Sequence, residues 1–406
     1  MRGWPHLGFI SLAAELVAAR PVQQRERMKR LLAALFVSLI PLAAVRAEAP
    51  QLPDGLYAEF ITPRGTLTAE LFFTRAPLMC TNFVGLAEGT LAPRNGQPFY
   101  TGLTWYRVVP GFVLQSGNPG LKDTDDEAHP IPHHFPDEFA PGLRHNCTGI
   151  LSMANAGPDT NSCEFFITLA PTPRLDFLHS VFGRIIRGLE LLPRIRADDA
   201  LTIKILRIGS AARAFRADPT SFTALAGKAP KYTAARAPGP AAFFDDPQNL
   251  LPAEPPRAKN FNYKLANVER ATGLKIRARL FAQSPPAAED AAPGQFMRAL
   301  ARQLGTEHAG ATVAYFADEK DWRVWIGEAS TTAFLGRPAT AADLGEDGAF
   351  HTAKDAFLSA AQIAGDQAYA EQKKSAPAAT TPPLAQHLKL QTDALIDALI
   401  TQLEPK

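Results

Sequence analysis

Residues 149–167 read GILSMANAGPDTNSCEFFI. Mainly apolar residues begin this stretch at 150–153 and close it at 165–167, and the mainly apolar pattern continues to Leu169. The residues between them are small or polar and include Gly157 and Pro158, a composition typical of a turn. The pattern predicts two short strands joined by a loop.

Strand-like patterns continue on both sides of this stretch. Apolar and polar residues alternate at 56–60 and 66–72 around a turn at 62–65, and further strand-like runs lie at 103–109, 111–115, 181–185 and 202–208. Pro77 is placed to open a helix that Gly89 would end. Many short strands with few helices favour a mainly β domain, built as a barrel or a sandwich.

A second motif, residues 106–117, reads YRVVPGFVLQSG. Together with residues 149–167, and with Leu175, His179 and residues 181–183 following in order, it closely resembles the signature segments of cyclophilin-type peptidyl-prolyl cis-trans isomerases. The resemblance covers residues 55–210, about the length of one domain. It implies a closed eight-stranded antiparallel barrel, capped by two helices, with an outer groove for proline-containing peptides.

The chemistry of such a domain requires neither nucleophile nor metal, so we expect no cofactor. Rotation about a peptide bond meets a barrier of about 18–20 kcal/mol, because the twisted amide loses its resonance. A catalyst therefore needs only to bind the twisted amide better than the planar one. An apolar pocket excludes water, and a guanidinium can donate to the proline nitrogen as its lone pair is released. Arg107 is the predicted donor.

The resemblance also implies roles for single residues. Catalytic roles fall on Arg107, Phe112, Gln115 and His179, with Gln115 bonding the substrate backbone and His179 closing the rim of the pocket. Substrate-binding roles fall on Met153, Ala154, Asn155, Ala156, Glu164, Phe166, Arg174 and Leu175. Taken singly, the apolar members would be read as core packing and Arg107 as a surface ion pair. The surrounding motifs favour the site roles.

Two residues depart from the family pattern, and they support an alternative function. Arg174 stands where many members have tryptophan, and Glu164 stands where glutamine is common. The Glu164 carboxylate could pair with Arg107, either preorganising it or competing with substrate. The alternative is therefore a catalytically weak proline-peptide binding module or chaperone.

Two other arrangements carry weaker signals. Residues 125–127 with His129, His133 and His134 gather metal-ligand types, but their spacing fits no defined metal site and favours a solvated loop. Ser152 or Ser162 with Asp176 and His179 could suggest a hydrolase triad. We reject it because the aspartate lies only three residues from the histidine and no nucleophile elbow is present.

The N-terminal region predicts export. Basic residues at 29–30 precede an apolar run at 31–45, and Ala47 offers a cleavage position, so residues 28–47 are predicted to be a bacterial secretory signal peptide. Residues 1–27 would then lie before the true translation start, which we place at Met28. The mature protein would be periplasmic or secreted, and the net charge of +2 implies neither nucleic acid nor a membrane as partner. For the three cysteines we favour buried free thiols over a disulfide.

Beyond residue 210 the sequence predicts a second domain. Residues 211–258 are rich in alanine and proline, as in an extended linker. Residues 259–372 combine strand-like runs at 275–280, 312–317 and 322–326 with a helical pattern at 295–304, which predicts a smaller α/β domain similar to TPM-type domains. A second linker at 373–386 leads to an amphipathic helix at 387–406, expected to pack on that domain.

Overall fold

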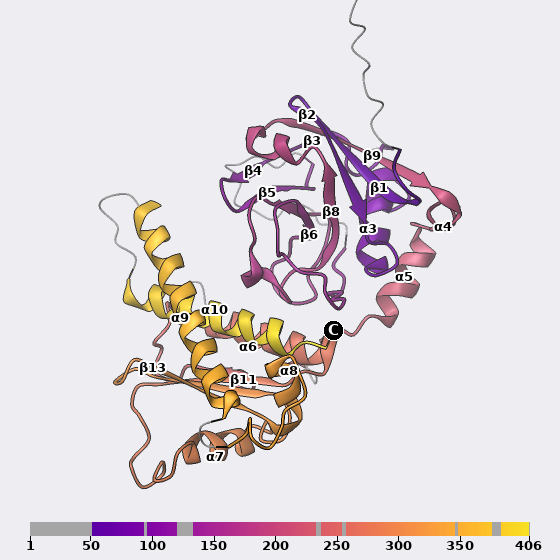
Figure 1. Ribbon diagram of the computed structural model, residues 1–406. Coiled ribbons are helices and arrows are strands. Elements are labelled where there is room, and N and C mark those ends of the chain that lie inside the picture. The colour runs from indigo at the N-terminus through magenta and orange to yellow at the C-terminus, as the bar shows by residue number, and fades with distance from the viewer. Residues whose placement is uncertain are drawn as a thin grey trace, which may run out of the picture. The chain divides into compact units, whose positions relative to one another are not determined.

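A curved antiparallel sheet forms the first half of the chain in the computed structural model (Figure 1). The structure describes residues 51–92, 96–119, 133–232, 237–253, 257–345, 348–375 and 383–405. The predicted signal peptide at 28–47 lies outside these ranges. Residues 53–406 form one unit by their contacts.

The sheet has nine strands among the described residues, in the order β3-β9-β1-β2-β8-β6-β7-β5-β4. Their bounds are β1 Gly55–Thr62, β2 Gly65–Leu71, β3 Leu103–Thr104, β4 Arg107–Val109, β5 Val113–Ser116, β6 Ile150–Met153, β7 Phe165–Thr168, β8 Val181–Arg187 and β9 Ala200–Ile208. The expected mainly β class is confirmed, but a closed eight-stranded barrel is wrong, because the sheet is open. Its end strands, β3 and β4, are two and three residues long. A side-chain bond from Ser116 Oγ to Thr104 O, 2.7 Å long, links β5 to β3 in place of a strand ladder.

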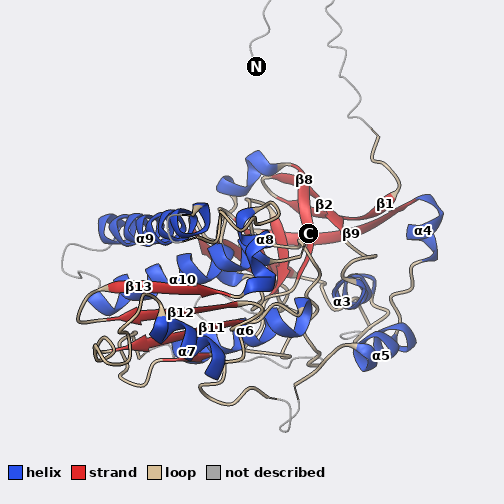
Figure 2. Cartoon of the chain, turned by 60° about the horizontal axis from the view of Figure 1, so that its bottom comes forward, coloured by secondary structure: helices blue, strands red, loops and turns tan. Residues whose placement is uncertain are grey.

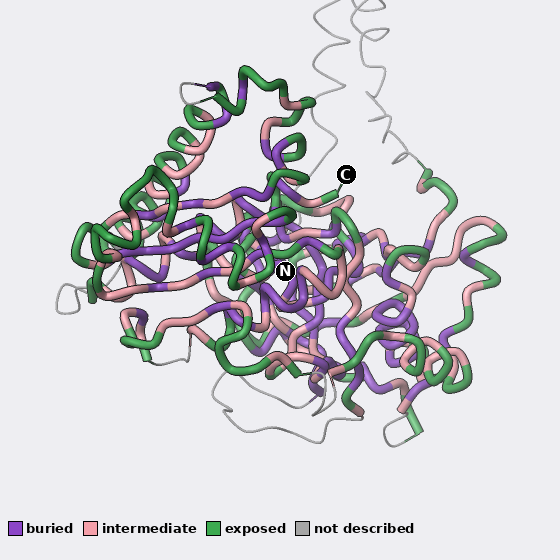
Figure 3. The backbone as a smooth tube through the Cα atoms, turned by 90° about the horizontal axis from the view of Figure 1, so that it is seen from below, coloured by how far each residue is buried: buried purple, intermediate pink, exposed green. Residues whose placement is uncertain are grey.

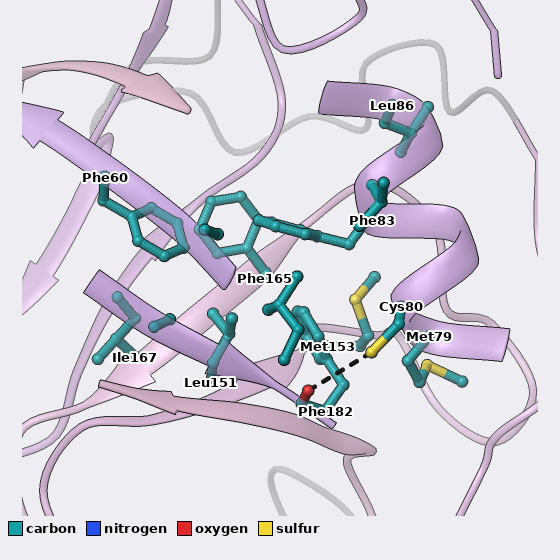
Figure 4. Packing of buried hydrophobic residues seen from close by; sticks show 14 of the residues in the cluster. Phe60, Met79, Cys80, Phe83, Leu86, Leu151, Met153, Phe165, Ile167 and Phe182 are labelled. Carbon is teal, nitrogen blue, oxygen red and sulfur yellow. Dashed lines mark hydrogen bonds between the residues drawn. The ribbon is translucent and has the colours of Figure 1, made fainter. Parts of the chain in front are cut away.

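Helix α3 (Pro77–Glu88) begins and ends where the sequence predicts, and it is buried in the core of this domain. Its Phe83 ring lies 5.3 Å from both Phe165 and Phe182 by ring centroids (Figure 4). The Glu138 carboxylate accepts hydrogen bonds from the first-turn amides of Leu78 (3.2 Å) and Met79 (3.0 Å), which satisfies donors that a helix start leaves unpaired. The core of the domain is thus centred on α3.

The second expected capping helix is not found within residues 55–210 as described. That part of the chain contains only short 3₁₀ helices besides α3 and the start of α4 (Gly209–Ala214), namely η1 (Pro173–Leu175) and η2 (Leu189–Arg194). Helix α5 (Pro219–Lys228) packs against α3 instead.

The region 211–258 differs from an extended linker. It holds most of α4, all of α5 and strand β10 (Phe244–Asp245). Asp218 accepts a 2.8 Å hydrogen bond from the amide of Ser221, and Pro219 occupies the first turn of α5. An N-cap aspartate followed by proline is a standard helix start, and the high content of alanine and proline obscured it.

The C-terminal half is an α/β domain, as predicted. Strands β10, β11 (Ile276–Phe281) and β12 (Ala311–Phe316) are parallel, and β13 (Asp321–Ile326) pairs antiparallel with β12. The helices are α6 (Arg257–Thr272), α7 (Gln295–Gln303), η3 (Glu328–Ser330), α8 (Thr331–Leu335), α9 (Ala349–Ser375) and α10 (Leu384–Leu403) (Figure 2). Leucines of α10 are buried with the strands in one core, which confirms that this helix packs on the domain. Figure 3 colours the backbone by burial, and exposed residues gather mainly in outer loops and helices. Helix α9 extends into the second predicted linker.

The described residues contain neither a disulfide nor a membrane-spanning helix. Cys80, Cys147 and Cys163 are all free thiols, as favoured, although Cys147 is exposed rather than buried. None of the helices within the described ranges is long and apolar enough to span a membrane.

Phe177 joins the two halves. It lies in the loop between η1 and β8, yet it is only 2% exposed and belongs to the hydrophobic core of the second domain. Its backbone carbonyl accepts a 2.7 Å hydrogen bond from Asn267 Nδ2 of α6. The Arg144 guanidinium stacks 4.0 Å from its ring centroid and pairs with Glu404 near the end of the chain. Phe177 also has a φ of 60°, which a side chain this large adopts only under strong packing.

Replacing Phe177 with alanine should destabilise the second domain, because the ring fills that domain's core. We expect the free energy of unfolding to fall by about 3–5 kcal/mol. Urea unfolding followed by tryptophan fluorescence measures this, since Trp322 lies in the same core. Phe177→Leu retains most of the side-chain volume, so its free energy of unfolding should fall clearly less than that of Phe177→Ala. An unchanged urea midpoint in Phe177→Ala would show that the two halves are not docked through this ring.

Candidate active site

Three of the predicted site residues lie in one row of the sheet, on neighbouring strands. Arg107 on β4 pairs with Gln115 on β5, and Gln115 pairs with Phe166 on β7. Phe166 in turn pairs with Ser152 on β6. Because residues directly opposite each other in a sheet project to the same face, the structure brings Arg107, Gln115 and Phe166 together.

Gln115 is the centre of a polar network. Its Oε1 accepts a 2.9 Å hydrogen bond from Arg107 Nη1, and its Nε2 donates to the Tyr106 hydroxyl (2.6 Å) and to Glu164 Oε2 (2.9 Å). Both ends of the Gln115 amide are thus hydrogen-bonded, and its oxygen is a positioned acceptor for the Arg107 guanidinium.

Glu164 does not pair with Arg107, which corrects the expectation from sequence. Its carboxylate accepts from the Tyr106 hydroxyl (2.6 Å), from Gln115 and from Asn118 Nδ2 (3.3 Å). Burial, with Glu164 beside it, raises the pKa of Tyr106 and keeps this hydroxyl a donor. Three donors therefore occupy the carboxylate, and it acts on Arg107 only through Gln115.

Arg107 itself is exposed. Within the described ranges no carboxylate lies at ion-pair distance from it, so these residues do not support the alternative reading as a surface salt bridge. Gln115 accepts from one of its five N–H donors.

Phe166 forms the floor of an aromatic group. Its ring is 4% exposed, stacks on His145 at 5.7 Å and 15° between planes, and meets the edge of His179 at 5.4 Å and 86°. His179 Nδ1 lies 3.1 Å from Met153 O, a position from which it donates. Burial, together with nearby His145, lowers the pKa of His179 to about 4. The ring at the predicted rim is therefore neutral at neutral pH.

A buried Ser–His–Asp arrangement lies under Phe166, and sequence reasoning missed its histidine. His145 Nδ1 lies 2.7 Å from Asp176 Oδ1, and its Nε2 lies 2.9 Å from Ser152 Oγ. Ser152 and His145 are fully buried. A substrate cannot reach a nucleophile there, so the rejection of hydrolysis stands, and the arrangement instead ties β6 to the loop after η1. No sequence motif around His145 predicts its position in this arrangement. Only its contacts with Asp176 and Ser152 in the folded structure reveal it.

The remaining predicted residues occupy different depths. Met153 is fully buried in the first domain's core, whereas Phe112 and Leu175 are half-buried. The Arg174 guanidinium lies 4.4 Å over the Phe112 ring. Asn155 is half-buried, and its Nδ2 donates to Leu178 O (2.9 Å). Ala154 and Ala156 flank it, with amides bonded to Glu164 O (2.9 Å) and Thr160 Oγ1 (2.9 Å).

A cleft of about 820 Å³ adjoins this site. Phe112, Leu175 and His179 line it from the first domain, and helices α6, α9 and α10 line it from the second. The second domain thus borders the predicted substrate groove.

A metal site is not supported by the described residues. Residues 125–127 and 129 lie outside them, and no group of three or more ligating side chains occurs in the rest. His133 packs 4.7 Å from the Phe222 ring, and its Nε2 contacts Asn82 Oδ1 at 2.7 Å. That arrangement is structural.

Comparisons with known proteins bear on the same region. A family model described as cyclophilin type peptidyl-prolyl cis-trans isomerase/CLD matches residues 57–209. Peptidyl-prolyl cis-trans isomerase-like 1 of Aspergillus fumigatus is 41% identical over 136 residues, which are 34% of this chain and 79% of that protein. Peptidyl-prolyl cis-trans isomerase ppi1 of Schizosaccharomyces pombe is 42% identical over 151 residues, covering 35% of this chain and 88% of the relative.

Among solved structures, a cyclophilin type peptidyl-prolyl cis-trans isomerase of Cryptosporidium parvum shares 31% sequence identity, with a TM-score of 0.32 over 38% of this chain and 97% of that one. The family match and the identity of the two fungal relatives over most of their length agree with the motifs at 106–117 and 149–167. On these grounds the chain belongs to the cyclophilin-type peptidyl-prolyl cis-trans isomerases.

Proposed function

We propose that the isomerase binds the twisted X-Pro amide against Phe112, Phe166 and Leu175 while Arg107 donates to the proline nitrogen. The observation that carries this proposal is the row Arg107–Gln115–Phe166, which sets a fixed guanidinium beside a buried aromatic floor. No covalent step is needed, because the reaction only rotates a bond.

Preorganisation supports Arg107 as the donor. The twisted amide leaves the nitrogen lone pair localised, and a donor already in position stabilises it without reorganising during the reaction. Gln115, held by Tyr106 and Glu164, supplies that position. A guanidinium cannot lose its proton in a protein, so the donor is present at every physiological pH.

An uncharged apolar floor supports the other half of the mechanism. Water stabilises the planar, more charge-separated amide, so its exclusion favours the twisted state. Phe166 is buried between two histidines, and burial lowers the pKa of both. Neutral rings keep this side of the pocket dry.

Weak catalysis with retained peptide binding is the second candidate function. The observation that favours it is Arg174, whose guanidinium covers the Phe112 ring at 4.4 Å and could narrow access to it. The Arg107 experiment below separates the two functions.

The cellular role is a further part of the proposal. We infer that clients are exported proteins, on the basis of the basic and apolar pattern at 28–47. The two relatives described above are fungal, so bacterial origin remains a prediction from sequence. The TPM-type resemblance of the second domain remains one too, because the family match ends at residue 209.

Arg107→Ala should lower kcat/KM for cis-trans exchange of an Ala-Pro peptide by about a hundredfold or more, because the donor to the proline nitrogen is lost. Exchange NMR measures the rate, and line broadening of the same peptide reports binding. Arg107→Lys keeps the positive charge but lacks the planar set of guanidinium donors, so it should recover only part of the lost kcat/KM. Wild-type protein that binds peptide without accelerating exchange would identify a binding module.

Glu164→Ala should lower kcat by about tenfold, since Gln115 loses a charged acceptor that fixes it. Glu164→Gln should restore nearly all of the rate, because an amide oxygen can still accept from Tyr106 and Gln115. KM should change little in both variants. If Glu164→Gln is as slow as Glu164→Ala, the charge rather than the positioning of Gln115 matters.

His179 predicts a dependence of stability on pH. Its folded-state pKa is lowered to about 4 from an ordinary value of 6.5, so between these values the unfolded chain binds the extra proton. The stability contributed by the neutral ring is therefore present above pH 6.5 and is lost as the pH falls toward 4. Isomerase activity should be flat from about pH 6 to 8.

Unfolding of wild type and His179→Gln by urea at several pH values measures the first effect. The difference in unfolding free energy between the two proteins should shrink as the pH falls. His145 also has a lowered pKa but is present in both proteins, so it cancels in this comparison. A difference that does not vary with pH would contradict the assignment to His179.

A further inference from the structure

We propose that the cleft beside the proline pocket is an extension of the substrate groove that binds an acidic side chain of the client peptide. This inference rests on the proposed isomerase function and names the substrate class. The cleft holds about 820 Å³ and is continuous from Phe112, Leu175 and His179 to Arg257, Lys264 and Lys389 on α6 and α10. A peptide with its proline in the pocket has this wall beside its flanking residues.

The charges that line the cleft are mostly positive. The lining includes four basic residues, Arg174, Arg257, Lys264 and Lys389, and two acidic residues, Glu371 and Asp393. The two lysines are neutralised locally, because Lys264 pairs with Asp397 and Lys389 pairs with Asp393. Arg174 and Arg257 have no carboxylate within ion-pair distance in the described parts of the chain. The cleft therefore presents two arginines to a ligand.

Arg257 shows the clearest need for an acceptor. Its Nε is buried and has no hydrogen-bond partner among the described residues. A buried donor without an acceptor is unfavourable, and such groups in native proteins call for an explanation. Arg257 is also the first residue of α6, where the helix dipole adds to its positive potential. Because Arg257 as a whole is half-buried and lines the cleft, a carboxylate from the peptide could lie against its guanidinium and its positive potential.

Arg174 places the second cation at the boundary between pocket and cleft. Its guanidinium lies flat over Phe112, a predicted pocket residue, and the side chain is exposed. The ring supports one face of the guanidinium while its edge donors remain available. Because extended peptide advances about 3.3–3.6 Å per residue, an acid within a few residues of the proline can reach one of the arginines.

The test uses residues 48–406 and matched peptides that differ in one residue. Each contains one Ala-Pro bond, with glutamate or glutamine placed one to four positions before or after the proline. Exchange NMR at low salt measures kcat/KM for each pair. In the best register we expect glutamate to exceed glutamine by about fivefold. The preference should decline as salt is raised.

Arg257→Gln should abolish that preference and leave the rate for the glutamine peptide unchanged. The matched control is Arg213→Gln, which removes the same charge from the exposed face of α4 and should keep the preference. Circular dichroism confirms that each variant folds. If Arg257→Gln does not fold, the comparison of glutamate and glutamine peptides on the wild-type protein still decides whether an acidic side chain is preferred.

The outcomes separate the two proposals. Equal rates for glutamate and glutamine peptides in every register, with both accelerated, would overturn the acidic subsite and leave the isomerase intact. A preference that survives when both Arg174 and Arg257 are replaced by glutamine would overturn the assignment to this cleft. No acceleration of any peptide would overturn the proposed function itself.

Discussion

Burial of Phe177 in the core of the second domain is the contact on which the site depends. Phe177 is two residues from Leu175 and two from His179, so fixing it fixes both of these predicted site residues. Its left-handed backbone conformation is unfavourable for a large side chain, and the surrounding core must hold it there. Lys264 adds a second tie, because its Nζ donates to Pro173 O at 3.1 Å. Contacts with the second domain thus hold the loop of the catalytic domain that carries these site residues.

The same loop is held from the other side by a buried polar network. Asp176 accepts from the amide and the ring of His145, and that ring supports Phe166 from below. Adjacent residues of one loop therefore point into two different cores. Since packed cores resist small displacements, the loop carries little freedom, and the pocket that it borders is preorganised.

Much of the catalytic domain could be predicted from sequence, because its motifs are local. Helix α3, most of the strands and the grouping of Arg107, Gln115 and Phe166 follow from periodicity and family resemblance. The errors concern long-range packing. The open ends of the sheet, the partners of Glu164 and the burial of Phe177 depend on which segments meet in space, and no local pattern records that. His145 is the plainest case, because its partners lie 7 and 31 residues away.

Arg174 shows how one substitution can serve both the pocket and the cleft. A tryptophan at this position would offer apolar area and a single N–H donor, whereas a guanidinium stacked on Phe112 offers a weakly hydrated face to the pocket and several donors at its edge. The face preserves a dry boundary, and the edge adds an electrostatic contact outside the reacting bond. Binding energy from such remote contacts can be used to hold the peptide in its twisted geometry. In the proposed acidic subsite, Arg174 would therefore act beside Arg257, at the end of the cleft that borders the proline pocket.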